Sequence, residues 1–229
     1  MTSFDEYGES YYQANGQSQD RPALRWYASL ARRYLGSGPI LDVGCGTGYL
    51  MKRLAAQGSQ VDGVEVSPYS AATARITSPS STVYADAQLL PAETYARFTA
   101  IHVVEHLADS DLRKMLEGLR RAALPQARYL IVTPDLAGRA RQLHGDRWNA
   151  FRDPTHINLK GHREWREFFV GEGFEVIREA SDGMWNVPYS NLPKPVDALR
   201  RSAPMALQFL SGRLFLRPGS GESSLFVLH

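Results

Sequence analysis

Apolar positions along the chain alternate between short continuous runs and stretches with helical spacing. The short runs predict strands at residues 40–43, 61–66, 82–85, 99–104, 129–132, 175–178 and 225–229. Between them apolar residues recur every three to four positions, most clearly at Leu112, Met115, Leu116, Leu119 and Ala123. Strands that alternate with helices in this way predict an α/β fold, a doubly wound and mostly parallel sheet.

Two stretches interrupt this alternation, at residues 137–161 and 183–211. Connections of this length are uncommon in compact domains and are often functional. We therefore expect them to be lid insertions after strands five and six, above a site at the carboxyl ends of the strands. Residues 1–229 are expected to form a single domain, with residues 1–38 as an N-terminal region whose helix begins near Pro22 and is capped by Asp20.

Composition narrows the class of protein. The 229 residues are 43% hydrophobic and carry a formal net charge of +2, and Cys45 is the single cysteine. One cysteine forms no internal disulfide, and no apolar run reaches the roughly 18 residues of a membrane span. The polar N-terminal residues do not have the layout of a signal peptide. We expect a cytoplasmic protein with no membrane partner, and the small charge does not favour nucleic acid.

The stretch from Ile40 to Leu50, ILDVGCGTGYL, predicts a ligand-binding turn. A strand runs through Asp42 into three glycines, Gly44, Gly46 and Gly48, and then into a helix. Glycine permits a tight turn and a close approach of ligand to backbone. The spacing is G-x-G-x-G, which differs from the G-x-G-x-x-G of dinucleotide-binding enzymes.

Acidic residues follow the next two predicted strands. Glu65 comes at the end of the second strand, where a carboxylate can accept two hydrogen bonds from a ribose diol. Asp86 ends the third strand, where a carboxylate can accept from an adenine amine. Either acid alone is as well explained by helix capping, but the series of three features on consecutive strands predicts a nucleoside-binding edge.

Taken together, these residues resemble a class I S-adenosylmethionine-dependent methyltransferase over nearly the whole chain. The resemblance implies a Rossmann-like, seven-stranded sheet whose last strand, residues 225–229, is antiparallel. It also implies S-adenosylmethionine as cofactor, with Glu65 on the ribose and Asp86 with Ala87 on the adenine. The implied contacts to the methionine part come from the first loop: Asp42, Gly44, Cys45, Gly46 and Gly48.

The segment HVVEHL follows the fourth predicted strand and contains His102, Glu105 and His106. Its letters match the H-x-x-E-H pattern of a zinc peptidase class, but that motif requires a helix and the β-branched residues here favour a strand. VVEHL is similar to the corresponding stretch of ubiquinone-pathway O-methyltransferases. Some of their relatives bind a divalent metal through E-x-x-E-H, and here His102 replaces the first glutamate. His102 is therefore a candidate cofactor contact, and the three residues together are a candidate metal site.

A second histidine lies in the first insertion, where the turn sequence Asp153-Pro-Thr-His156 resembles bacterial methyltransferases that act on natural products and cell-surface sugars. His106 and His156 are candidate general bases or a paired metal site, because a neutral imidazole removes protons near neutral pH. Glu105 completes the candidate catalytic set. Residues 137–163 hold six basic side chains against two acidic ones, and the second insertion contains Met184, Trp185, Tyr189 and Phe209. These residues favour a small metabolite with an anionic group as substrate, and a solvated basic face over an apolar patch explains them equally well.

The sequence thus predicts methyl transfer to an oxygen or nitrogen atom of a small molecule. An NAD-dependent oxidoreductase is disfavoured by the glycine spacing and by the lack of a Tyr-x-x-x-Lys pair after the fourth strand. A nucleic-acid methyltransferase remains an alternative, although HVVEHL stands where an Asn/Asp-Pro-Pro-Tyr motif is usual. The third alternative is a non-catalytic protein that senses the same ligand. The sequence specifies no oligomeric state.

Overall fold

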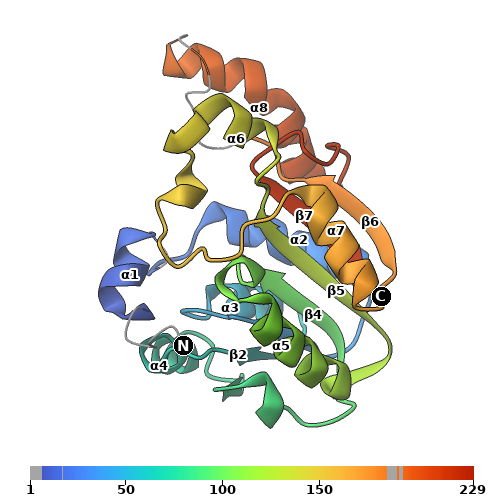
Figure 1. Ribbon diagram of the computed structural model, residues 1–229. Helices are drawn as coiled ribbons and strands as arrows, with labels where there is room; N and C mark the ends of the chain where they lie inside the picture. Colours follow the sequence, from blue (N-terminus) through green and yellow to red (C-terminus); the bar gives the residue numbers. More distant parts are fainter. Residues whose placement is uncertain (1–6, 17, 185–189, 191–192) are drawn as a thin grey trace. The chain divides into compact units, whose positions relative to one another are not determined.

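The strands of the protein form a seven-stranded sheet in the order β3-β2-β1-β4-β5-β7-β6 (Figure 1). The structure is a computed structural model that describes residues 7–16, 18–184, 190 and 193–229, apart from the side chains of residue 198 and residues 200–204. The strands are β1 Ile40–Val43, β2 Val61–Val64, β3 Val83–Tyr84, β4 Tyr95–Ile101, β5 Ala123–Pro134, β6 Val176–Ser181 and β7 Ser223–Leu228. β1 is parallel to both β2 and β4, and β7 is antiparallel to β6. The predicted sheet and its antiparallel closing strand are confirmed.

The order of strands reverses between β1 and β4, since β2 and β3 lie on one side of β1 and β4 lies on the other. In open α/β sheets ligands bind at such a switch point, outside the carboxyl ends of the strands. The glycine loop that follows β1 therefore occupies the position where this fold binds a ligand.

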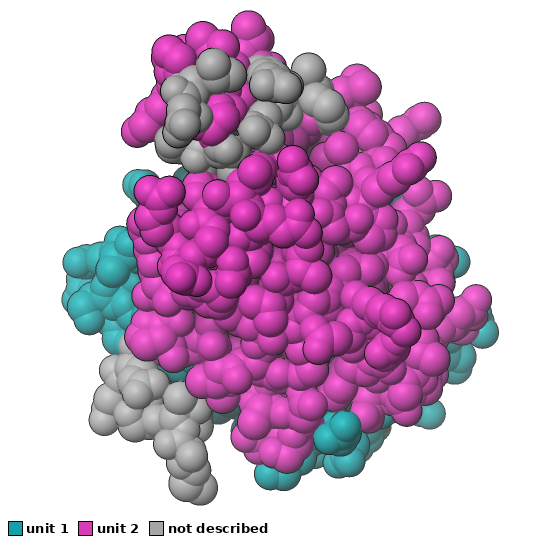
Figure 2. All heavy atoms as spheres, turned by 45° about the horizontal axis from the view of Figure 1, so that its top comes forward, with its two compact units in different colours: residues 1–101, 113–129 teal, residues 102–112, 130–229 magenta. Residues whose placement is uncertain are grey.

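The described chain divides into two compact units, residues 1–101 with 113–129 and residues 102–112 with 130–229 (Figure 2). The first unit contains α1 Glu9–Ala14, α2 Pro22–Tyr34, α3 Tyr49–Ala56, α4 Pro68–Thr77, the 3-10 helix η2 Ala87–Leu89 and most of α5 Asp109–Ala122. All four residues of β1 are buried, and Phe98 of β4 stacks on Tyr129 with ring centroids 4.5 Å apart. This packing holds the strand that leads into the glycine loop.

The second unit contains the 3-10 helix η3 Val104–His106, α6 Arg139–His144, η4 Gly145–Arg147, η5 Asn149–Phe151, α7 His162–Gly171 and α8 Lys194–Ser211. Its core includes Trp165, Phe169 and Phe226, which are fully buried. A separate apolar cluster is formed by Ala140, Trp148, Ala150, Met184 and Met205. Because this cluster draws on both predicted insertions, the two insertions pack against each other.

The fourth strand ends earlier than predicted, at Ile101 rather than at residue 104. The backbone N–H of His102 still donates to the Val132 carbonyl at 2.8 Å, but His102 has a φ of +57°. This left-handed conformation turns the chain, and Val104–His106 forms a 3-10 turn instead of strand. The β-branched pair at 103–104 was therefore misleading about secondary structure.

Two further expectations need correction. Asp20 does not cap α2, whose N-cap is Arg21, because the Asp20 carboxylate instead accepts two hydrogen bonds from Arg53 at 2.7 Å. Residues 183–211 are not a loop throughout, since α8 occupies Lys194–Ser211. Trp185 and Tyr189 lie outside the described residues. In the part of the chain that the structure describes, no helix is long and apolar enough to cross a membrane.

Candidate functional site

The glycine loop between β1 and α3 adopts the backbone that the sequence predicted. Gly44, Gly46 and Gly48 have φ values of +62°, +53° and +84°, a region that side chains disfavour. At Gly48 a Cβ would lie 2.8 Å from Cα of Ala74 on α4. The third glycine therefore permits close packing of α4 on the loop.

Glu65 is tied to this loop by hydrogen bonds from the backbone. Its Oε2 accepts from the Gly46 N–H at 2.9 Å and its Oε1 accepts from the Ser67 N–H at 2.8 Å. The side chain is buried, and this burial raises the pKa of Glu65 while the backbone donors oppose the rise. The Val66 N–H is a third backbone donor to this carboxylate, which has about four acceptor positions and can still accept from a ligand.

A second buried acid, Asp42, lies within β1. Its Oδ1 accepts a hydrogen bond from Thr99 Oγ1 at 2.7 Å. Burial raises the pKa of Asp42 to about 7, against the effect of Thr99 and with a further rise from the charge of Glu65. Two buried carboxyl groups that disfavour each other's ionisation favour a cationic ligand.

The residues around the glycine loop, among them the predicted cofactor contacts Cys45, Asp86 and Ala87, differ in burial. Tyr12 of α1 is buried, and its Cε1 lies 3.4 Å from where a Cβ on Gly46 would be. Cys45 is buried against Gly63, where a Cβ would come within 2.6 Å of the Cys45 sulfur. Asp86 is exposed and accepts the Gln88 N–H at 2.8 Å as the N-cap of η2, whereas Ala87 is buried. Their predicted contacts to adenine remain predictions.

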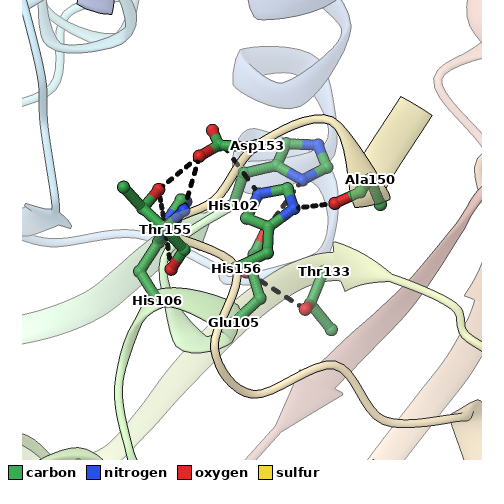
Figure 3. A network of polar contacts seen from close by, with 8 residues as sticks. All are labelled: His102, Glu105, His106, Thr133, Ala150, Asp153, Thr155 and His156. Carbon is green, nitrogen blue, oxygen red and sulfur yellow. Dashed lines mark hydrogen bonds and ion pairs between the residues drawn. The ribbon is translucent and has the colours of Figure 1, made fainter.

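The histidine-containing segment belongs to the second unit, where η3 places Glu105 and His106 (Figure 3). Glu105 is completely buried; its Oε1 is 3.1 Å from Nδ1 of His102 and its Oε2 accepts from Thr133 Oγ1 at 3.1 Å. Burial alone would raise the pKa of Glu105, but the hydrogen bond and charge of His102, with the charge of His106, hold it below its usual value. The two neighbouring histidines thus favour the ionised form of this buried carboxyl group.

His106 and His156 are held by oxygen atoms at Nδ1. His106 Nδ1 lies 3.2 Å from the Thr155 carbonyl and 2.9 Å from its Oγ1, which in turn bonds to Asp153. His156 Nδ1 lies 2.7 Å from the Ala150 carbonyl. A carbonyl oxygen only accepts, so Nδ1 is the donor in both rings and Nε2 carries the lone pair when the ring is neutral.

The two rings lie together, with centroids 4.6 Å apart (Figure 3). Burial lowers the pKa of His106; the charge of Glu105 opposes this and that of His156 adds to it. One ligand atom each from Glu105, His106 and His156 lies within 4.8 Å of the others. Two imidazoles and a carboxylate suit zinc or iron(II), and Nδ1–H groups fixed by oxygen are the usual support for histidine ligands.

His102 takes a different place from the one the sequence suggested. Its Nδ1 is directed to Glu105, its side chain is 36% exposed, and the group of converging ligand atoms contains His156 in its stead. The predicted metal set of His102, Glu105 and His106 thus shares two residues with the observed group. The roles predicted for His102 remain predictions.

Sequence reasoning did not select Thr99 and Thr133, which hold the two buried carboxylates Asp42 and Glu105. Both threonines are completely buried. A hydroxyl in an otherwise apolar strand needs a polar partner, so a threonine in the run LIVT was the available signal.

Part of the basic character of residues 137–163 is used within the protein. Lys160 donates to Asp109 at 2.7 Å, Arg163 pairs with Glu167 at 2.8 Å, and Arg141 lies over the Phe151 ring at 4.9 Å. The other three basic residues of the segment are exposed: Arg139, Arg147 and Arg152. These three are the candidates for contact with an anionic substrate.

Comparisons with known proteins agree with this geometry. A family model described as a methyltransferase domain matches residues 14–179. A ubiquinone biosynthesis O-methyltransferase of Thiobacillus denitrificans is 33% identical over 94 residues, 38% of this chain and 40% of that protein. Its counterpart in Azoarcus sp. is 31% identical over 93 residues, 41% of this chain and 37% of that protein. The match thus spans about two fifths of the length of these curated relatives.

Solved structures show the same fold. A SAM-dependent methyltransferase from Archaeoglobus fulgidus has a TM-score of 0.60 at 17% identity, covering 96% of this chain and 99% of that one. The mitomycin 7-O-methyltransferase MmcR has a TM-score of 0.66 at 16% identity, covering 100% of this chain and 60% of that one. At this level of identity the likeness concerns the fold alone.

Proposed function

The chain belongs to the methyltransferase domain family, and we propose that it transfers a methyl group from S-adenosylmethionine to an oxygen or nitrogen atom of a small metabolite. The observation that carries this proposal is the buried Glu65 carboxylate, fixed by the Gly46 N–H at the end of β2. A preset acceptor beside a glycine loop is what a ribose diol requires.

The residues of the first unit fit this cofactor. Glu65 would accept from the ribose hydroxyls, and Asp42 with Glu65 would compensate positive charge. Bound there, S-adenosylmethionine supplies an electrophilic methyl group on a sulfonium. The two buried acids disfavour the pyrophosphate of a dinucleotide, which argues against the oxidoreductase alternative.

The second unit provides groups that can take a proton from the acceptor. His106 and His156 each present an Nε2 lone pair, and the ionised Glu105 stabilises positive charge on the imidazoles. Glu105 is completely buried, so it acts through the histidines rather than on substrate directly. Orientation of the reactants supplies about 7–11 kcal/mol and a general base about 10²–10⁴-fold in rate.

Divalent-metal assistance is the second candidate, and the convergence of Glu105, His106 and His156 within 4.8 Å favours it. An ion held by these residues would supply Lewis acidity toward a substrate hydroxyl. The exposed Arg139, Arg147 and Arg152 support a small anionic substrate, of natural-product or sugar type as the sequence resemblance suggests.

Calorimetry with S-adenosylmethionine and with NAD tests the proposal, followed by assay of S-adenosylhomocysteine formation with hydroxylated and amine acceptors. The expected result is binding of S-adenosylmethionine but not of NAD, weakened about 10–100-fold in Glu65→Gln. Binding of NAD instead would overturn it, and cofactor binding without turnover on any acceptor would indicate a sensor. Metal analysis of protein purified without chelator, compared with His156→Ala, distinguishes the metal-assisted form from a purely histidine-based one.

A further inference from the structure

Helix α8 presents apolar side chains on its outer face. Val196, Leu207 and Leu210 are 50%, 60% and 83% exposed, and Leu199 is 76% exposed. We call these four residues the α8 stripe. Their spacing places them on one face of a helix. Isolated exposed apolar residues are ordinary, but several of them on one helix face mark a surface that a partner covers.

The buried face of α8 combines the apolar Met205 with two polar side chains that are hydrogen-bonded. Gln208 is completely buried; its Nε2 donates to the Ser181 carbonyl at 2.9 Å and its Oε1 accepts the Phe215 N–H at 3.0 Å. Asp197 is also completely buried and accepts from Ser190 Oγ at 2.8 Å. These contacts fix the rotation of the helix about its axis, so the α8 stripe faces outward because the inner face is held by hydrogen bonds.

The charged residues near the α8 stripe indicate which kind of partner covers this surface. Residues 193–217 contain five basic residues, Lys194, Arg200, Arg201, Arg213 and Arg217, and one acidic residue, Asp197, which is buried. Arg213 and Arg217 are exposed at the end of the helix, beside Phe215, which is 46% exposed. A second copy of the chain would bring like charges together, whereas an anionic lipid surface brings opposite charges.

We propose that the α8 stripe, together with the exposed Arg213 and Arg217, docks on the surface of a bilayer that contains anionic lipid. Leucines entering the interface with arginines at headgroup level are the arrangement of helices that lie in the plane of a membrane. This inference concerns attachment to a surface and not a span, and it departs from the sequence-based expectation of no membrane partner. It does not depend on the proposed methyl transfer.

Vesicle flotation of the full chain tests the proposal. The protein is expected to float with vesicles of phosphatidylcholine and phosphatidylglycerol, to remain unbound with phosphatidylcholine alone, and to be released by salt. The double variant Leu207→Gln/Leu210→Gln is expected to bind about tenfold or more weakly, because it removes two apolar anchors. Arg213→Gln/Arg217→Gln is expected to weaken binding and to reduce its dependence on salt.

Ile76→Gln is the matched control, since Ile76 is 81% exposed on α4 and belongs to the other unit. It is expected to leave flotation unchanged. Circular dichroism and S-adenosylmethionine binding report whether each variant is folded. The proposal is overturned if the protein ignores phosphatidylglycerol vesicles, if Leu207→Gln/Leu210→Gln floats as the wild type does, or if the stripe instead drives dimerisation measured by analytical ultracentrifugation.

Discussion

The two units carry their functional groups in different ways. In the first, Glu65 is held by backbone N–H groups of Gly46 and Ser67, next to regular strands. In the second, Glu105 is held by the side chains of His102 and Thr133, and the histidines are held through loops and 3-10 turns. Backbone donors are fixed by the sheet, whereas side-chain donors depend on the packing of several segments.

The two units should therefore differ in how well they tolerate substitution of their side chains. The first unit binds through a frame that most side-chain changes leave intact. The second unit assembles its imidazoles through contacts between residues far apart in sequence, such as His106 with Thr155. We therefore expect substitutions in the second unit to change the rate, and substitutions in the first to change cofactor affinity.

The largest expected effect is the fall in kcat when His106 or His156 is replaced. His156→Ala or His106→Ala should lower kcat by about 10²–10⁴-fold, because each removes an Nε2 proton acceptor. The dissociation constant of S-adenosylmethionine should stay within about twofold of the wild type if the units divide the work as described. Steady-state kinetics and calorimetry measure the two quantities. His144→Ala on α6 is the control, and an equal loss in that variant would contradict a specific role.

The second effect concerns cofactor affinity. Glu65→Gln replaces the carboxylate by an uncharged amide with one accepting oxygen, so it keeps only one of the two backbone contacts from Gly46 and Ser67. Since hydrogen bonds to charged groups contribute about 1.5–3 kcal/mol, we expect the dissociation constant of S-adenosylmethionine to rise about 10–100-fold. Calorimetry measures this rise. Glu117→Gln, on the exposed side of α5, should bind as the wild type does, and unchanged binding in Glu65→Gln would remove the ribose assignment.

These two units were not equally accessible to sequence reasoning. The glycine loop, Glu65 and the alternation of strands with helices follow local patterns, because G-x-G-x-G and an acid after a strand indicate their geometry within a few residues. The histidine cluster depends on contacts over long separations: Glu105 with Thr133 and His106 with Thr155. His102 is the clearest example of what the sequence did not predict. Its left-handed backbone, with a φ of +57°, could not be inferred from the β-branched residues that follow it.

The third effect is on the pH dependence of cofactor binding. Asp42 has a pKa raised to about 7, so its ionised fraction falls as the pH drops below that value. If the cationic cofactor favours the ionised form, affinity should fall about tenfold between about pH 8 and pH 6. The sign follows because binding lowers the raised pKa and releases a proton. Calorimetry across this range measures the change, and Asp42→Asn should bind weakly at every pH with a flat profile.

The smallest expected effect tests the difference between a carboxylate held by backbone donors and one held by side-chain donors. Thr133→Val removes the hydroxyl that donates to Glu105 Oε2 and leaves a buried ionised carboxylate with one partner fewer. The free energy of unfolding should fall by about 1–3 kcal/mol. The pKa of Glu105 should rise, because a donor to its charged form is lost, so the acidic limb of the kcat profile should move to higher pH. Thr133→Ser keeps the hydroxyl and should restore the acidic limb, and a shift of equal size in both variants would show that packing alone is at work. Thr99→Val, which acts on Asp42 in the first unit, should instead leave the kcat profile unchanged and alter the pH dependence of cofactor binding.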